Sequence, residues 1–235
     1  MKQSQLRDTD PADDKRKGRA TRPKLSASLI LLRNTNTEVQ FLMGKRAASH
    51  RFMPGKFVFP GGRVDRADSR APCASAICPK LLNTMTQQLS RPRALATAAA
   101  AIRETYEETG LKLAKPANRT SKAPLAYQAF SSNQLGLDLA ALSLLARAIT
   151  PPYHPKRFDT WFFTAQTDNL IDDPADLASG ELEQLQWVTF QQAQSLDLPL
   201  ITQMVLKDLQ SKSQQQNTPT PFYHSRHAKH IREFL

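Results

Sequence analysis

Cysteine is scarce in this sequence of 235 residues, which contains only Cys73 and Cys78. Two thiols are too few for a disulfide scaffold, and a zinc site would need two further ligands close by. We therefore expect a reduced setting, in which both cysteines act as small apolar side chains.

Long apolar runs are also missing. No stretch approaches the ~18 apolar residues of a membrane span. The N-terminus lacks the apolar segment of a secretory signal, and its acidic residues Asp8, Asp10, Asp13 and Asp14 are atypical of an organellar transit peptide. The expectation is a soluble, cytoplasmic protein that has no membrane partner.

Acidic residues are outnumbered, because 32 Lys and Arg face 21 Asp and Glu, and the formal net charge is +11. Much of the excess lies near the ends, from Lys15 to Lys24 and from Arg226 to Arg232. The N-terminal arm has no interleaved aromatic residues, and no RNA- or DNA-binding module is visible. A positive field also attracts small polyanions such as nucleotides or diphosphate esters. We expect such a substrate rather than polymeric nucleic acid.

Composition divides the chain into three parts. Residues 1–23 are polar and charged, which is typical of a flexible arm. Residues 24–210 alternate short strand patterns with helix patterns, which indicates an α/β or α+β domain with a mixed β-sheet between helices. Within that domain, residues 69–93 form an insertion with one short helix. Residues 211–235 are predicted to be a polar linker and a basic tail.

Several local patterns are specific enough to predict elements. Strand-length apolar runs joined by Asn34-Thr-Asn-Thr37 predict a hairpin, and Pro60-Gly61-Gly62 stops an aromatic strand where glycine allows a close approach of the backbone to a ligand. The remaining predictions are a helix running into a strand over 135–149, a proline loop followed by an aromatic strand within 150–165, a strand over 181–190, and one or two amphipathic helices over 190–210.

The most informative stretch runs from Leu95 to Leu111. Its alanines favour a helix, and Gly110 lies where a C-terminal cap belongs. Glu104, Glu107 and Glu108 would then be neighbours at i, i+3 and i+4, where like charges repel one another. A helix built only for stability would not choose this arrangement.

A hard divalent cation would reverse that repulsion, because Mg²⁺ takes oxygen ligands from carboxylates and from substrate phosphates. Arg103 lies one turn before Glu107 and is placed to hold that carboxylate by a forked hydrogen bond. The alternative is a solvated acidic face without a metal.

Two segments, Phe59-Pro-Gly-Gly-Arg-Val-Asp65 and Arg103-Glu-Thr-Tyr-Glu-Glu-Thr-Gly-Leu111, together resemble the sequence box of the Nudix hydrolases. That box runs Gly, five residues, Glu, seven residues, then Arg-Glu-apolar-x-Glu-Glu-x-Gly-apolar. Thr105 stands where an apolar residue is usual, and Asp68 stands at the first Glu. Between Asp68 and Arg103 lie 34 residues, 69–102, which is an insertion of 27. Extra loop length costs little closure entropy, so we expect the helix still to dock under the Gly-Gly loop.

The resemblance covers about residues 24–210 and implies a Nudix-type α/β/α sandwich. The segments from Arg51 to Asp65 and from Thr150 to Phe163 look like the branch that contains peroxisomal coenzyme A diphosphatases and their bacterial relatives. The implied activity is hydrolysis of a nucleoside diphosphate linked to another group, with coenzyme A or acyl-coenzyme A favoured. Alternatives are an ADP-ribose or NADH diphosphatase, RNA decapping through the basic arm, and a catalytically silent nucleotide-binding regulator.

The resemblance also implies Mg²⁺ or Mn²⁺ as cofactor and gives roles to particular residues. Glu104 and Glu108 would be the main metal ligands, Glu107 a further ligand or base, and Arg103 the residue that orients them. The Gly62 carbonyl would complete the shell, together with Glu181 or Glu183, which would equally suit a charged strand edge.

Substrate-binding candidates surround the predicted mouth of the site. Cationic side chains would bind phosphates and aromatic rings would stack on a base. The main candidates are Arg46, Arg51, Phe52, Arg157 and Phe158, with His50, Tyr153 and Lys156 nearby. Arg157 and Phe158 would equally serve as anchors of the strand, and a homodimer is an open alternative for the assembly.

Overall fold

The computed structural model of the protein describes residues 21–36, 38–48, 53–117, 123–152, 154–172, 182–214, 219–226 and 229–235. The strands are β1 (Lys24–Asn34), β2 (Val39–Arg46), β3 (Phe57–Val58), β4 (Gly61–Arg63), β5 (Cys73–Ser75), β6 (Ala114–Pro116), β7 (Leu135–Asp138), β8 (Ser143–Ile149), β9 (Phe158–Gln166), β10 (Leu182–Thr189), β11 (Pro221–Arg226) and β12 (Lys229–Phe234). The helices are α1 (Pro79–Thr86), α2 (Arg91–Thr109), α3 (Gln128–Ser131), α4 (Phe190–Ala193) and α5 (Leu200–Gln214), with 3-10 helices η1 (Arg66–Arg70), η2 (Leu125–Tyr127), η3 (Leu139–Ala141) and η4 (Thr167–Asn169). Over these ranges, no helix is long and apolar enough to cross a membrane.

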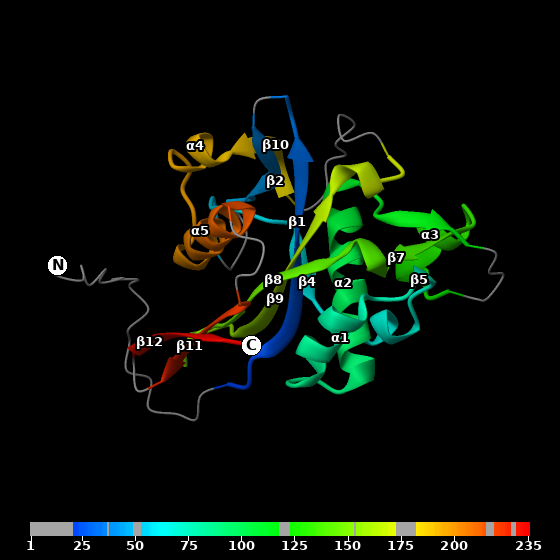
Figure 1. The fold of residues 1–235 in the computed structure, drawn as a ribbon, viewed down its shortest axis with the longest axis horizontal. Coiled ribbons are helices and arrows are strands. Elements are labelled where there is room, and N and C mark those ends of the chain that lie inside the picture. The colour runs from blue at the N-terminus through cyan, green and yellow to red at the C-terminus, as the bar shows by residue number, and fades with distance from the viewer. Residues whose placement is uncertain are drawn as a thin grey trace.

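A nine-stranded mixed sheet forms the middle of the molecule, in the order β10-β2-β1-β9-β8-β11-β12, with β3 on β2 and β4 on β1. Helices α1 and α2 cover one face of this sheet, and α4 and α5 cover the other (Figure 1). Strand β1 pairs antiparallel with β2 and parallel with β9. The predicted α/β/α architecture with a mixed sheet and the predicted β1–β2 hairpin are confirmed.

Strand β1 is apolar on both of its faces because it lies at the centre of this sheet. Leu29 and Leu31 join the core under α2, whereas Ile30 between them joins the core under α5. Successive side chains of a strand point to opposite faces, so one apolar run serves two cores.

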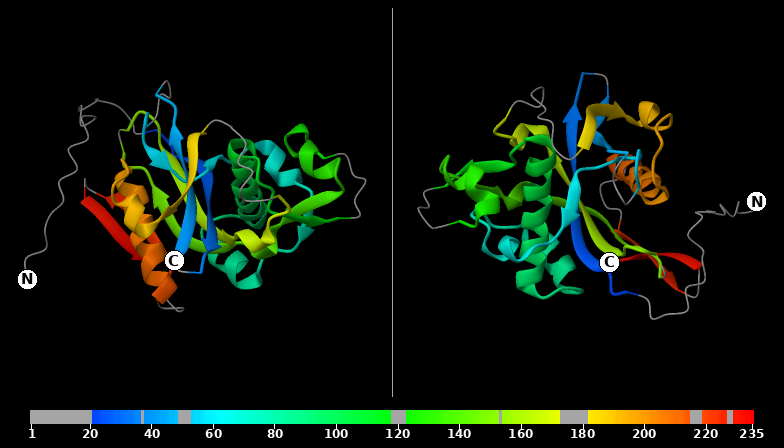
Figure 2. Two further views of the ribbon diagram at one scale, coloured as in Figure 1. Left: turned by 90° about the horizontal axis from the view of Figure 1, so that it is seen from above. Right: turned by 180° about the vertical axis from the view of Figure 1, so that it is seen from behind.

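The insertion at 69–93 is folded into the domain. Its strand β5 pairs with β7 in a second sheet of three strands, β5-β7-β6. Its helix α1 buries Leu81, Leu82 and Met85 in the same core as the alanines of α2. Figure 2 shows the second sheet and α1 beside α2, on the side of the main sheet away from α5. Asp68 and Arg103 can therefore meet although the insertion separates them.

The helix predicted within 135–149 is wrong. This stretch forms β7, the short η3 turn and β8. Leucine and alanine are good helix formers, but helix propensity amounts to less than about 1 kcal/mol per residue, and the pairing of β7 with β6 and of β8 with β9 overrides it. The Asp138 carboxylate is fully buried at the end of β7. It accepts a hydrogen bond from Ser75 Oγ and forms an ion pair with Lys115.

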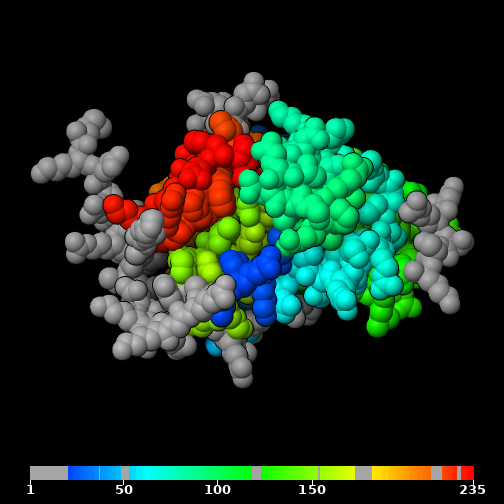
Figure 3. Space-filling view, turned by 90° about the horizontal axis from the view of Figure 1, so that it is seen from below, coloured from blue at the N-terminus to red at the C-terminus, as the bar shows by residue number. Residues whose placement is uncertain are grey.

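Within the segment predicted as a linker and tail, residues 211–214 end α5, and the described tail residues join the main sheet. Strands β11 and β12 form an antiparallel hairpin, and β11 pairs parallel with β8. The buried Arg147 guanidinium pairs with Asp159 through two nitrogens at 2.8 Å and lies 4.6 Å from the ring centre of Phe222 on the hairpin. Its third nitrogen donates to Gln88 from the insertion. The hairpin and the insertion share one surface of the molecule (Figure 3).

Candidate active site

Helix α2 carries the predicted carboxylates and begins and ends as its sequence indicates. Pro92 lies in its first turn, and Gly110 ends it in the left-handed conformation, with φ of 80° and a hydrogen bond from its N–H to the Tyr106 carbonyl. Thr105 takes the usually apolar position of the box because its hydroxyl is satisfied by the Ala101 carbonyl at 2.8 Å. The helix predicted from Leu95 to Leu111 is confirmed.

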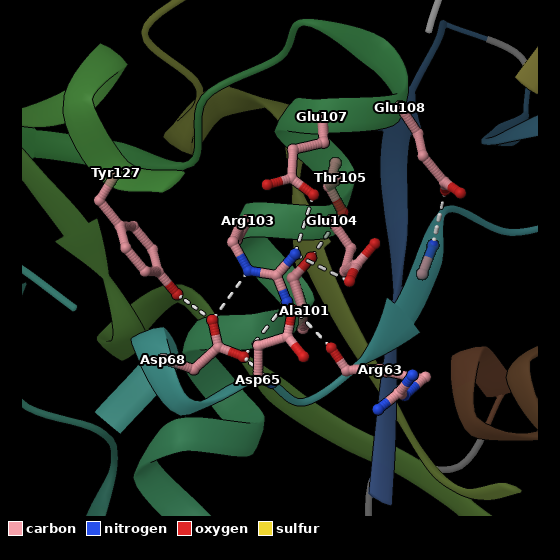
Figure 4. Close-up of polar contacts among 11 residues, drawn as sticks. Arg63, Asp65, Asp68, Ala101, Arg103, Glu104, Thr105, Glu107, Glu108 and Tyr127 are labelled. Carbon is pink, nitrogen blue, oxygen red and sulfur yellow. Dashed lines mark hydrogen bonds and ion pairs between the residues drawn. The ribbon is translucent and has the colours of Figure 1, made fainter. Parts of the chain in front are cut away.

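The Pro60-Gly61-Gly62 segment, which was predicted as a loop and whose two glycines begin strand β4, docks directly on the carboxylates of α2. The Gly61 N–H donates to Glu108 Oε2 at 2.8 Å (Figure 4). A Cβ on Gly62 would lie 2.4 Å from the Cδ atom of Glu104, so only glycine fits against this carboxylate. Strand β4 itself is held by pairing with β1. Two residues of one loop therefore mark where Glu104 and Glu108 face the same space.

Arg103 is the centre of the polar cluster, and each of its five N–H donors has a partner. Nε and Nη2 donate to the two carboxylate oxygens of Asp68 at 2.8 and 3.2 Å. Nη1 donates to Glu104 Oε1 and to Glu107 Oε2, both at 2.8 Å. The second Nη2 donor reaches the Arg63 carbonyl at 2.9 Å. One guanidinium thus ties α2, β4 and the start of the insertion together.

Arg103 forms its bidentate hydrogen bond with Asp68. The sequence had predicted this bidentate contact for Glu107, which accepts a single hydrogen bond. The Glu107 side chain is 42% exposed and already solvated, whereas that of Asp68 is fully buried. A buried carboxylate needs the stronger bidentate partner, and the partly solvated one is left with a single hydrogen bond.

Asp68 occupies a fully satisfied position on η1. Its Oδ2 accepts from the Asp65 N–H at 2.7 Å, and its Oδ1 accepts from the Tyr127 hydroxyl at 2.6 Å. Tyr127 is a member of the cluster that the sequence did not reveal, because it lies in η2, far from the box in the chain, in a stretch without a motif.

Burial and like charge set the electrostatics of the cluster. Burial raises the pKa of Glu104 to about 7, against the opposing effect of Arg103 and with a smaller contribution from Glu107. Burial opposes the charged form of Arg103, but Asp68, Glu104 and Glu107 outweigh it and raise the Arg103 pKa above its ordinary value. Three carboxylates, those of Asp68, Glu104 and Glu107, share the single guanidinium of Arg103, so acidic groups outnumber basic ones in the cluster.

The carboxylates do not form a closed cage. Among the residues that the structure describes, no three His, Cys, Asp or Glu side chains are arranged to hold a metal ion by themselves. Glu107 and Glu104 lean on Arg103, whereas Glu108 turns toward Gly61 (Figure 4). The site therefore places the carboxylates of Glu104 and Glu108 beside Gly62 and Gly61 without closing a ligand cage around a common point.

The residues predicted to bind substrate either hold the ends of strands or lie outside the described part of the chain. Arg46 ends β2, where its backbone bonds to Lys56 and Gly55. Arg157 donates to the backbone carbonyls of Thr150 and Thr21 at 3.0 and 2.6 Å, and Phe158 starts β9. These contacts are those of strand anchors. The other predicted residues, His50, Arg51, Phe52, Tyr153 and Glu181, lie outside the described part of the chain.

Three proteins of known family are similar to this chain. The Caenorhabditis elegans protein named "Putative nudix hydrolase 7" is 31% identical over 175 residues, which cover 69% of this chain and 50% of that protein. Acyl-coenzyme A diphosphatase NUDT19 of Xenopus laevis is 29% identical over 110 residues, which cover 38% of this chain and 29% of that protein. The chain thus spans half or less of these curated relatives.

The crystal structure of a NUDIX hydrolase from Alicyclobacillus acidocaldarius matches with a TM-score of 0.60 and 27% identity, over 80% of this chain and 90% of that one. No protein-family model matches the sequence. The structural match includes most of both chains, and the two halves of the box meet in space as the resemblance predicted. The chain belongs to the Nudix hydrolase superfamily.

Proposed function

We propose that this protein is a divalent-metal-dependent hydrolase of nucleoside diphosphates linked to another group, with coenzyme A or acyl-coenzyme A as the favoured substrate. The observation that carries the proposal is the close docking of Gly61 and Gly62 on Glu108 and Glu104. The name of the Xenopus relative, an acyl-coenzyme A diphosphatase, supports the choice of substrate.

The donor set fits Mg²⁺ or Mn²⁺. Both are hard cations that prefer carboxylate, carbonyl and water oxygens. Mg²⁺ is usually held by one or two carboxylates together with water and substrate phosphates, so an open site suits it better than a closed cage. Glu104 and Glu108 would hold the ion, with Glu107, the Gly62 carbonyl and Glu181 as further ligands. The ion would polarise the phosphoryl group and lower the pKa of a bound water.

The residues of the chain would contribute by holding this geometry. Arg103 fixes the carboxylate of Glu104 from one side, and the Gly62 backbone fixes it from the other. The Gly61 N–H keeps Glu108 turned to the same loop. Glu107, which is partly solvated, would serve as a further ligand or as the base that takes the proton of the attacking water.

The phosphates of the substrate would be bound by cationic side chains at the mouth. Arg46, at the end of β2, and Arg51 would bind the phosphates, and Phe52 would stack on the base; Arg51 and Phe52 lie outside the described residues. Arg157 and Phe158 were predicted for this role as well, but the backbone bonds of Arg157 favour an anchor role.

An assay of the purified protein tests the proposal. With Mg²⁺ or Mn²⁺, we expect coenzyme A or an acyl-coenzyme A to be hydrolysed to two phosphate-containing products, detected by ³¹P NMR, and EDTA to stop the reaction. ADP-ribose, NADH and capped RNA complete the panel. Preference for one of these would redirect the substrate assignment, and tight binding without turnover would indicate a nucleotide-binding regulator.

Replacing either main ligand by its amide should remove activity without unfolding the protein. We expect Glu104→Gln and Glu108→Gln each to lower kcat on the order of 10²–10³-fold, since each removes a negative charge that would hold the ion. The amide oxygen still accepts the hydrogen bond from Arg103 or Gly61, so circular dichroism should be unchanged. Glu38→Gln, on the exposed β1–β2 turn, is the matched control. Wild-type rates in both site variants would contradict the metal assignment.

A further inference from the structure

The carboxylate of Asp68 is unusually well satisfied for a side chain that is fully buried. It accepts four hydrogen bonds, two from the Arg103 guanidinium, one from the Asp65 N–H and one from the Tyr127 hydroxyl. Burying a charge is costly unless it is paired and hydrogen-bonded. The shortest of the four, at 2.6 Å, comes from Tyr127.

Tyr127 reaches this carboxylate from outside the box. It lies in η2, its side chain is fully buried in the core under α2, and its ring centre is 6.2 Å from that of Phe130. Burial and the charge of Asp68 both raise the Tyr127 pKa, so the hydroxyl stays protonated and acts as a donor. The ring is held by packing, and the hydroxyl is therefore fixed at one place.

We propose that Tyr127 and Asp68 are a matched pair that positions Arg103 and, through it, the catalytic carboxylates. Asp68 is one methylene shorter than the Glu of the Nudix box, and the Tyr127 hydroxyl fills the space and supplies the contact that this shortening leaves. Exchanging Asp-Tyr for Glu-Phe adds one carbon and removes one oxygen, so the pair keeps its number of heavy atoms. The inference rests on the proposed function, because it explains how that function is kept with Asp at this position.

The contacts form one continuous path. The Tyr127 hydroxyl fixes Asp68 Oδ1, the same oxygen accepts from Arg103 Nε, and Arg103 Nη1 holds Glu104 and Glu107. Tyr127 lies on one side of Arg103 with its hydroxyl toward Asp68, and Glu108 lies on the opposite side (Figure 4). Tyr127 is a positioning residue that acts through Arg103 and makes no contact with the reacting atoms.

A double-mutant cycle of Tyr127→Phe and Asp68→Glu tests the pairing. We expect Tyr127→Phe to lower kcat and weaken Mn²⁺ binding by about 10- to 100-fold, as partners of metal-holding groups commonly do, with little change in the KM for the nucleotide. Asp68→Glu alone should lower kcat as well, because it overfills a packed site. The double variant should recover most of the loss.

Tyr106→Phe is the matched control, since the Tyr106 ring also packs on Phe130, at 5.3 Å, and within the described residues its hydroxyl shows no hydrogen bond. It should behave as the wild type. All variants are compared at a temperature where circular dichroism shows them to be folded. Wild-type kcat and Mn²⁺ affinity in Tyr127→Phe, or a double variant no better than its worse single parent, would overturn the pairing.

Two readouts keep this inference separate from the proposed function. Free Mn²⁺ measured by electron paramagnetic resonance gives the metal affinity without any substrate, and thermal unfolding gives the coupling between positions 68 and 127. If the wild type hydrolyses no member of the panel, the proposed function fails. A positive coupling in both readouts would then still support the pair, and additive effects would reject it.

Discussion

Replacing Arg103 with methionine is expected to destabilise the protein more than any other single change in the site. The Arg103 side chain is only 4% exposed and is the cationic partner of Asp68, Glu104 and Glu107. Its loss leaves the buried Asp68 charge without its ion pair, and breaking a buried pair in this way costs about 3–5 kcal/mol of unfolding free energy. For a domain of this size each kcal/mol lowers Tm by about 2–4 °C. Differential scanning calorimetry measures the shift.

A matched variant separates stability from activity. Arg147→Met removes another buried guanidinium that grips a carboxylate, Asp159, but lies outside the candidate active site. We expect it to lower Tm while kcat below the unfolding range stays near the wild-type value. Arg103→Met should lose both Tm and turnover. Equal kcat in the two variants would show that Arg103 holds the fold and contributes nothing to the geometry of the site.

Local sequence signals were sufficient for the elements that place the carboxylates. The alanines and Gly110 define the helix that became α2, and the spacing of Glu104, Glu107 and Glu108 follows from helical geometry alone. The close approach of the Gly-Gly pair to a carboxylate was also predictable, because glycine is required where backbone approaches another group closely. That the two glycines belong to strand β4 follows from their pairing with β1 and was not predicted. These features depend on neighbours within a few turns of chain, so the sequence carries them directly.

Elements and contacts whose partners lie far away in the sequence could not be predicted from local patterns. Strand β5 has three residues and becomes a strand only by pairing with β7, in which Cys73 lies opposite Leu137, 64 positions along the chain. The tail hairpin joins the main sheet only through the pairing of β11 with β8, in which Phe222 lies opposite Arg147, 75 positions earlier in the chain. Tyr127 carries no motif, and its role depends on a hydrogen bond across 59 residues. In each case the deciding partner is set by the tertiary fold.

Gly62→Ala is expected to abolish most of the activity while leaving the fold largely intact. The new Cβ would lie 2.4 Å from both Cδ and Oε2 of Glu104, which is impossible without movement. The Glu104 carboxylate is the end of a flexible side chain, so it will rotate away and lose its hydrogen bond to Arg103. A hydrogen bond to a charged group contributes about 1.5–3 kcal/mol to stability. Displacing a reacting group by ~1 Å can cost on the order of 100-fold in rate.

The reason for that loss can be tested by combining Gly62→Ala with Glu104→Gln. The amide is as large as the carboxylate, so the steric clash and its cost in stability remain in the double variant. Its charge is already gone, so displacing it further should lower kcat little beyond Glu104→Gln alone. Coupled sites show such non-additivity, whereas independent ones add. If the fold-loss in kcat of the double variant equals the product of the two single losses, Gly62 acts through something other than the position of Glu104. The Gly62–Glu104 contact would then not explain why glycine stands at this position.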